Sequence, residues 1–182
     1  MVRMPLLPVE EEGRLCDPVL RENFMQRVFA YRRLREVFSG SWRVKEVIQF
    51  HEQEKLLLLS HDPEGCRSLG RIVAQIRQLT REEVKEQYQR QFMETLSVKM
   101  TPRRHCNVLQ RMVGFFSESL SSEQRQEMLG VIEDFRHQLV PLVVPLTLLQ
   151  HYVSRFKVTY LGRQSYLAPV PKQLMCRNYT LS

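Results

Sequence analysis

The sequence predicts an all-α protein, a compact single-domain bundle of about seven helices. Three observations predict it: apolar residues recur at helical spacing, capping residues precede the apolar stripes, and the seven glycines are too few for a turn-rich β architecture. No segment shows the sustained alternation that a half-buried strand needs. A chain of 182 residues, 43% of them hydrophobic, can fill one core but is short for two. We therefore expect residues 1–16 to be a linker-like segment and residues 17–182 to form one helical domain.

Each predicted helix has residues that can cap or start it. The expected starts, in chain order, are Asp17-Pro18, Ser41, Asp62-Pro63, Thr80 with Glu83, Thr101-Pro102, and Ser121 or Ser122. A seventh helix is expected within residues 141–156, where Pro145 either begins the helix or kinks it. Residues 140–153 are apolar on nearly all sides, so we expect them at the centre of the bundle. Residues 158–182 carry several tyrosines and prolines and are expected to pack as an irregular C-terminal tail.

Positive charge is concentrated in parts of the chain. The formal net charge is +7 and the pI is about 9.5. Residues 95–117 contain no acid, and Asp134 is the last acidic residue. The basic residues that follow it are Arg136, Arg155, Lys157, Arg163, Lys172 and Arg177. Such clustering favours a polyanionic partner, the alternative being a solvated basic surface without a partner.

Cysteine usage and hydropathy exclude several classes of protein. The four cysteines form no C-x-x-C pair, so we expect no metal, no iron–sulfur cluster and no other cofactor in this chain. The most apolar stretch, residues 139–149, is interrupted by two prolines and is too short to span a bilayer. With no secretory signal visible, we expect a cytoplasmic protein without membrane contact. Nucleotide-binding, hydrolase and metalloprotease motifs are missing, so we expect no catalytic residues and no catalytic activity of its own.

The second predicted helix carries polar residues on its apolar face. On a helical wheel His51 and Lys55 fall among Val44, Val47 and Leu58. A lysine is rarely buried unless it is paired, so Lys55 either extends along the bundle edge, pairs with a buried acid, or lines a polar pocket. We expect a pocket between helices that could hold an anion or a base. Its predicted lining is His51, Lys55, His61, Arg71, His105 and His151.

The start of the fifth predicted helix breaks a local rule. Arg103 and Arg104 lie in its first turn, where the helix dipole favours acidic residues. The free backbone N–H groups of that turn suit a phosphate. Asn107 and Gln110 share the helical face of Arg103, and such side chains can contact bases or sugars. The alternative is an exposed polar face on which the arginine is salt-bridged.

Several motifs, taken in order, resemble the YbgA-like family, long classed as a domain of unknown function. They are residues 29–35 (FAYRRLR), 51–61 (HEQEKLLLLSH), 69–71 (LGR), 101–110 (TPRRHCNVLQ), 145–152 (PLTLLQHY) and 160–166 (YLGRQSY). The resemblance covers nearly the whole chain after Asp17. It departs from the family's pattern at Arg111, where many members have histidine. Residues 7–15 resemble the linker found in fused members.

The family resemblance implies a function in tRNA modification. Members occur alone or fused behind a thiouracil-desulfidase-like (TudS-type) domain with an iron–sulfur cluster, which removes sulfur from 4-thiouridine in tRNA. The resemblance implies that the YbgA-like half helps to hold the tRNA. We therefore expect a tRNA-binding accessory domain whose partners are tRNA and a TudS-type domain, fused or separate.

The expected RNA-binding residues come from charge placement, wheel positions and the resemblance together. They are Arg32, Arg33, Arg103, Arg104, Asn107, Gln110, Tyr152, Tyr160, Arg163 and Gln164. Two other functions remain open at this point. One is a ligand-binding or enzymatic domain built around the polar pocket, and the other is a helical module that docks a partner protein.

Overall fold

The computed structural model describes residues 6–174 and Arg177, and Cys176 lies outside the described residues. Helices account for its regular structure, and the described part of the chain contains no strand, which confirms the predicted all-α fold. The longer helices are α1 (Pro18–Val37), α2 (Val44–His61), α3 (Pro63–Ala74), α4 (Arg81–Ser97), α5 (Pro102–Gly114), α6 (Ser122–Arg136) and α7 (Val143–Phe156). The short ones are α8 (Thr159–Gly162) and the 3-10 helices η1 (Glu12–Cys16), η2 (Ser165–Leu167) and η3 (Lys172–Leu174). None of the described helices is both long and apolar enough to cross a membrane.

Five of the predicted N-caps are confirmed by side chains that accept hydrogen bonds from first-turn N–H groups. They belong to Asp17, Asp62, Thr80, Thr101 and Ser121. Each satisfies a backbone donor that the helix leaves without an internal partner. These contacts are local in sequence, which is why the chain alone predicts them.

The prediction that Ser41 caps the second long helix was wrong. That helix begins after Arg43, whose backbone N–H donates to the Glu46 carboxylate at 2.8 Å. The reason is Trp42, which is 6% exposed and packs edge-on against Phe38. The chain stays non-helical long enough to insert this indole into the core, and the helix starts only beyond it.

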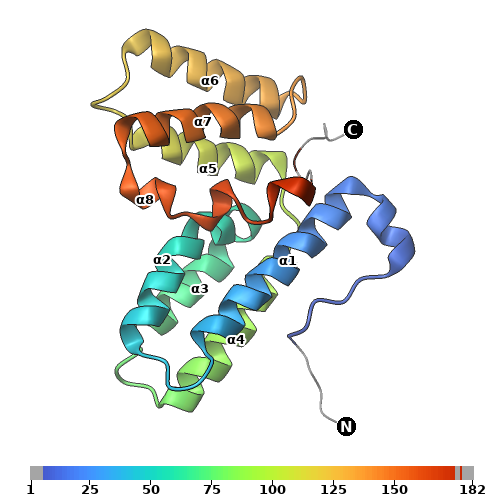
Figure 1. Cartoon of the computed structure of the whole chain (residues 1–182), viewed down its shortest axis with the longest axis vertical. Coiled ribbons are helices and arrows are strands. Elements are labelled where there is room, and N and C mark those ends of the chain that lie inside the picture. The colour runs from blue at the N-terminus through green and yellow to red at the C-terminus, as the bar shows by residue number, and fades with distance from the viewer. Residues whose placement is uncertain (1–5, 175–176, 178–182) are drawn as a thin grey trace.

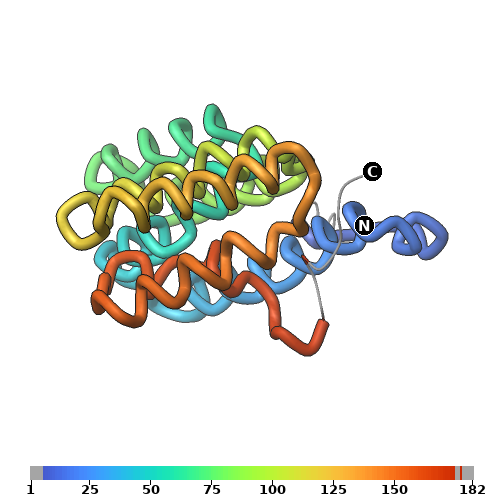
Figure 2. The backbone as a smooth tube through the Cα atoms, turned by 90° about the horizontal axis from the view of Figure 1, so that it is seen from above, coloured from blue at the N-terminus to red at the C-terminus, as the bar shows by residue number. Residues whose placement is uncertain are grey.

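The helices form two groups that cross each other (Figure 1). Helices α1 to α4 pack on one another, and α5, α6 and α7 form a second group that runs across the first. Figure 2 shows α6 and α7 side by side, with the chain after α7 turning back along the molecule. Helix α2 joins the groups because it contacts α5 and η2 as well as α1, α3 and α4.

The prediction that residues 140–153 form the central helix was wrong. Val144 is 39% exposed, and Thr147 and His151 continue the same solvent-facing stripe of α7. The opposite side buries Leu146 and Leu149. Helix α2 takes the central place instead. Apolar composition does not say whether a second layer of helices covers a face, and on α7 no other part of the described chain covers this stripe.

Both terminal segments pack on the bundle. The N-terminal segment that composition marked as a linker includes η1, which contacts α1, and it buries Pro8. The described part of the segment after α7, predicted to be an irregular tail, consists of the short helices α8, η2 and η3 joined by loops, and it buries Tyr166 completely. Gln164 is also buried: its Oε1 accepts the N–H of Leu56 at 3.1 Å and its Nε2 donates to the carbonyl of Glu52 at 2.8 Å. One amide side chain thus bonds to both ends of a single turn of α2.

Candidate nucleic-acid interface

The predicted donor face of α5 is exposed. Arg103, Asn107 and Gln110 all reach solvent, and Gly114 continues their row. Within the part of the chain that the structure describes, Arg103 forms no ion pair, so the salt-bridged alternative does not apply to it. This face therefore presents two exposed amides and a guanidinium that is in no ion pair with a described residue.

Arg104, by contrast, holds the fold together. Its Nη1 donates to the backbone carbonyl of Lys99 at 3.0 Å and to that of His61, the last residue of α2. A cation at this position also favours the negative end of the α2 dipole. The Arg104 guanidinium, predicted to contact phosphate, is instead engaged in joining the end of α2 to the loop before α5.

Arg33 is also occupied by structural contacts. Its Nε and Nη2 donate to the two carboxylate oxygens of Glu54 at 2.7 and 3.0 Å, and its Nη1 donates to the carbonyl of Pro169 at 3.1 Å. Glu54 is 1% exposed and accepts a further hydrogen bond from the Ser165 hydroxyl at 2.6 Å. The prediction that Arg33 contacts phosphate was therefore wrong. Its neighbour Arg32 remains at the surface, where it pairs with Glu36 at 3.0 Å.

The two candidate tyrosines have different surroundings. Tyr152 is 5% exposed and stacks on Phe156, so its predicted role of stacking on a base was wrong. Tyr160 is half-buried and stacks on Phe115, with ring centroids 5.0 Å apart and planes inclined by 21°. Phe115 is 46% exposed. Gln164, also predicted to bind RNA, is inside the fold as described above.

Basic side chains from three helices gather around Cys66 near this aromatic pair. Burial raises the pKa of the Cys66 thiol, and the positive charges of Lys55, Arg111 and Arg67 act in the opposite direction. Arg67 is paired with Glu64, whereas Lys55 and Arg111 form no ion pair with any described residue. Burial raises the pKa of Tyr160 too, the negative charge of Glu52 raises it further and the Arg111 charge opposes the shift, so both Glu52 and Arg111 lie close to Tyr160.

Together these residues define one surface, which we call the basic surface: the exposed cations Lys55, Arg103, Arg111 and Arg163 and the aromatic pair Phe115–Tyr160. Arg163 belongs to it because it lines a surface hollow together with Tyr160. Sequence reasoning did not select Arg111 or Phe115 as site residues. The signal was present, since both follow the α5 donor face within the acid-free residues 95–117.

The predicted polar pocket does not form as one cavity. Lys55, Arg71 and His151 are exposed, and Arg71 pairs with Glu64 at 3.3 Å. For Lys55, the structure corresponds to the alternative in which the lysine lies at the edge of the bundle. The expectation that these three side chains line a pocket was wrong.

The remaining histidines of the predicted pocket each have a separate partner. His51 Nδ1 lies 3.1 Å from the Tyr88 hydroxyl and His105 Nδ1 lies 2.8 Å from the Tyr166 hydroxyl. His61 is fully buried, with its Nδ1 2.8 Å from the carbonyl of Val98. Burial lowers the pKa of His51 and of His61 to about 4, so both rings are neutral at pH 7. These are hydrogen-bonded core residues, and among residues 6–174 and Arg177 no group of three His, Cys, Asp or Glu side chains could hold a metal ion.

The family is decided by sequence comparison. The family model described as "Protein of unknown function (DUF1722)" matches residues 55–171, more than half of the chain. The chain belongs to the DUF1722 family. Over 153 residues it is 29% identical to the "Uncharacterized protein YbgA" of Escherichia coli (strain K12), which covers 84% of this chain and 90% of YbgA. This confirms the resemblance to the YbgA-like family. No solved structure matches the chain.

The DUF1722 match includes every residue of the basic surface. Lys55 is its first residue, and α5 and α8 lie well inside it. The Arg33 and Glu22 side chains, which hold α1 to the rest of the bundle, lie outside it. The candidate interface is thus built on the part of the fold that defines the family.

Proposed function

We propose that this DUF1722 chain binds RNA through the basic surface and that its RNA is tRNA. The observation that carries the proposal is that Lys55, Arg103, Arg111 and Arg163 are exposed and form no ion pair within the described residues. Other exposed arginines are either paired with glutamates, as Arg90 is, or unpaired within the described residues, as Arg77 and Arg125 are, so what sets the four cations apart is that they share one surface with the aromatic pair. Cations outside ion pairs can neutralise phosphates and release counterions. One acidic side chain, Glu52, lines the same hollow as Arg163 and Tyr160.

The aromatic pair and the α5 amides support contact with bases as well as phosphates. Phe115 exposes nearly half of its surface beside Tyr160, and unstacked RNA bases stack on such rings. Asn107 and Gln110 lie on the same helix and can donate to base edges or sugars. A solvated basic surface without a partner gives no reason for an exposed phenylalanine stacked on Tyr160.

We further propose that the chain serves a TudS-type desulfidase that acts on 4-thiouridine, in cis or in trans. This part rests on the resemblance to the YbgA-like family. Two thiols of this chain, those of Cys66 and Cys106, are buried and burial raises the pKa of both, whereas Cys16 is exposed. In this proposal the sulfur chemistry belongs to the partner, and this chain holds the substrate.

Salt-dependent tRNA binding tests the proposal. The affinity of the chain for tRNA should fall steeply between 50 and 200 mM KCl, roughly as a power law whose exponent counts the neutralised phosphates. The double variant Arg103→Ala/Arg111→Ala should reduce that exponent by about 1.5 and weaken binding at least about tenfold at low salt.

The matched control is Arg77→Ala/Arg125→Ala, which removes two exposed arginines on other parts of the molecule that form no ion pair with any residue the structure describes. It should leave the exponent within about 0.5 of the wild-type value. Absence of tRNA binding at 50 mM KCl by folded protein, or equal losses in the two double variants, would overturn the assignment.

A further inference from the structure

The hollow that Arg163 and Tyr160 line at the edge of the basic surface has a polar lining that includes both signs of charge. It has a volume of about 470 Å³ and lies between α2 and residues 160–164. The α2 wall consists of three exposed polar side chains on one face of that helix. They are Gln49, Glu52 and Gln53.

The two walls of the hollow are fixed to each other by Gln164. Its buried amide accepts the N–H of Leu56 and donates to the carbonyl of Glu52, whose side chain lines the hollow. The next residue, Ser165, donates to the buried Glu54 carboxylate at 2.6 Å. The hollow is therefore preformed, and a ligand that enters it does not have to order the walls.

Opposite charges line the hollow without pairing. The side chains of Glu52 and Arg163 are exposed, and neither forms a hydrogen bond or an ion pair with any residue that the structure describes. The carboxylate and the guanidinium are too far apart to bond to each other, so both can bond to a molecule that lies between them. Such a molecule must offer hydrogen-bond donors to Glu52 and acceptors to Arg163.

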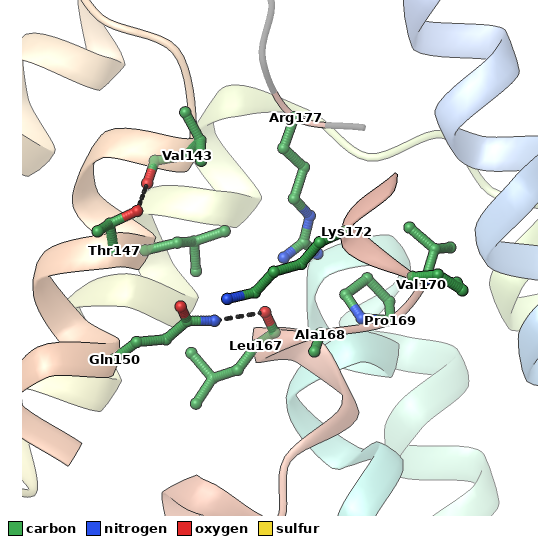
Figure 3. A pocket seen from close by; sticks show the side chains of 11 residues that line it. Val143, Thr147, Gln150, Leu167, Ala168, Pro169, Val170, Lys172 and Arg177 are labelled. Atoms are coloured by element: carbon green, nitrogen blue, oxygen red, sulfur yellow. Dashed lines mark hydrogen bonds between the residues drawn. The ribbon is translucent and has the colours of Figure 1, made fainter. Parts of the chain in front are cut away.

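The cavity between α7 and residues 167–172 lacks such a set of available groups (Figure 3). Its lining is largely apolar, and its two polar α7 side chains are already engaged. Gln150 Nε2 donates to the carbonyl of Leu167 at 2.9 Å, and Thr147 Oγ1 donates to the carbonyl of Val143 at 2.7 Å. The hollow beside α2, by contrast, gathers polar side chains that have no partner within the described part of the chain.

Tyr160 connects this hollow to the rest of the basic surface. Its ring stacks on Phe115 with centroids 5.0 Å apart, and both Glu52 and Arg111 lie close to it. A nucleotide bound at this place can therefore keep its phosphate near Arg111 while its base enters the hollow beside Tyr160.

The carboxylate of Glu52 favours an uncharged base over a phosphate in the hollow. It repels an anion, but it can accept hydrogen bonds from two adjacent N–H groups. Guanine presents two such groups side by side, N1–H and the 2-amino group, and an arginine can donate to both its O6 and its N7. Adenine, cytosine and uracil each offer Glu52 a single N–H-bearing group next to a lone pair, which the carboxylate repels.

We propose that the hollow binds an unpaired guanine of the RNA. Glu52 accepts hydrogen bonds from N1–H and the 2-amino group, and Arg163 donates to O6 and N7. At roughly 30 Å³ for each water-sized group, the hollow has room for about fifteen non-hydrogen atoms, and a purine base has about ten. The inference rests on the RNA binding proposed above and refines it, because it gives Arg163 a base to contact instead of a phosphate.

Short single-stranded RNAs test the preference for guanine. In fluorescence titrations of the full chain at 50 mM KCl, a uridine decamer with one central G should bind at least about fivefold more tightly than decamers with a central A, C or U, because one bidentate contact to a base is worth at least about that factor. A central inosine, which lacks the 2-amino group, should lose most of this preference. Free GMP should bind more weakly than the G decamer, because it lacks the neighbouring phosphates.

Two variants separate contact with the base from contact with phosphate. Glu52→Gln should reduce the preference for G to less than about twofold without weakening the all-uridine decamer, because an amide cannot accept from both N–H groups. Arg163→Gln should also remove the preference and leave the salt exponent of the all-uridine decamer within about 0.3, whereas loss of a phosphate contact would lower that exponent by about 1. Glu127→Gln, on the exposed side of α6 and outside the hollow, is the matched control and should keep the preference.

The outcomes distinguish this inference from the proposed function. Salt-dependent binding of all decamers without a preference for G would overturn the inference and leave the proposed function standing. A preference that survives in Glu52→Gln would overturn it too, and so would GMP binding more tightly than the G decamer, which would make the hollow a site for free mononucleotides. Absence of binding by every decamer would also overturn the inference, and the tRNA titration described above decides separately whether the proposed function fails with it.

Discussion

The buried ion pair between Arg33 and Glu54 allows the sharpest test of how this fold is held together. It links α1 to α2 directly and links both to the C-terminal segment through Ser165 and Pro169. Glu54→Gln keeps the shape of the side chain and removes its charge. The variant leaves the Arg33 guanidinium facing a neutral amide, with at most one of its two carboxylate hydrogen bonds retained.

The expected cost follows from the burial of the two partners. Removing one partner from a fully buried ion pair costs about 3–5 kcal/mol. The Arg33 side chain is 29% exposed, so water can reach part of the guanidinium, and the cost should be lower. We expect about 2–3 kcal/mol, which for a chain of this size lowers Tm by about 5–10 °C.

Urea unfolding followed by circular dichroism measures this free energy, and the neighbouring pair provides the control. Arg32 and Glu36 form the same kind of ion pair one residue away but at the surface, with side chains 75% and 61% exposed. Glu36→Gln should cost less than about 0.5 kcal/mol. Arg33→Gln combined with Glu54→Gln should cost clearly less than the sum of the single variants. A loss below about 1 kcal/mol for Glu54→Gln, or strict additivity in the cycle, would refute the reasoning.

Three further predictions concern a histidine, two glycines and a glutamine. Burial lowers the pKa of His61 to about 4, so between pH 6.5 and 4 the unfolded chain takes up a proton that the folded chain does not. The contribution of neutral His61 to stability is complete above pH 6.5, and about 3 kcal/mol of it is lost by pH 4. The free energy of unfolding should therefore depend less on pH in His61→Gln than in the wild type. Gly65→Ala should destabilise the fold by about 1–3 kcal/mol because the added Cβ would lie 2.3 Å from Thr95 Oγ1. Gly130→Ala, in open space on α6, should stabilise it by about 0.5–1 kcal/mol. Thermal melts in which the two variants shift Tm in the same direction would contradict this. Gln164→Leu should cost about 1–3 kcal/mol and speed amide hydrogen exchange in the middle of α2, and exchange unchanged there would argue against the bridging role of this amide.

The part of the fold that was predictable depends on contacts within one turn of chain. Asp17, Thr80 and Ser121 cap their helices with side chains that bond two or three residues ahead, and sequence shows both partners. Ser41 has the same chemistry and caps nothing, because the place where the helix starts is set by the burial of Trp42 in the core. Helix starts are thus predictable except where tertiary packing decides them.

The candidate site was less predictable, because the same residue type serves both surface and core. Arg32 and Arg33 are adjacent and identical in sequence, yet only Arg33 meets a buried acid, twenty-one residues away. Lys55 falls on the apolar face of α2 in a helical wheel. A wheel gives the direction of a side chain around one helix axis, but it does not show whether another helix packs against that side. The α5 face was predictable because the acid-free residues around it exclude local ion pairs. The role proposed for Phe115 could be inferred only from the structure, because it depends on Tyr160 lying beside it.

The contacts that Gln164, Ser165, Tyr166 and Arg177 make inside the bundle have a consequence for the order in which the protein is made. During synthesis, α1 and α2 leave the ribosome long before these residues do. Until then Glu22 lacks its Arg177 partner, Glu54 lacks the Ser165 hydroxyl, and one turn of α2 lacks its amide bridge. We expect the first four helices to pack together early but loosely, and to reach native rigidity only when residues 164–166 and Arg177 dock against them.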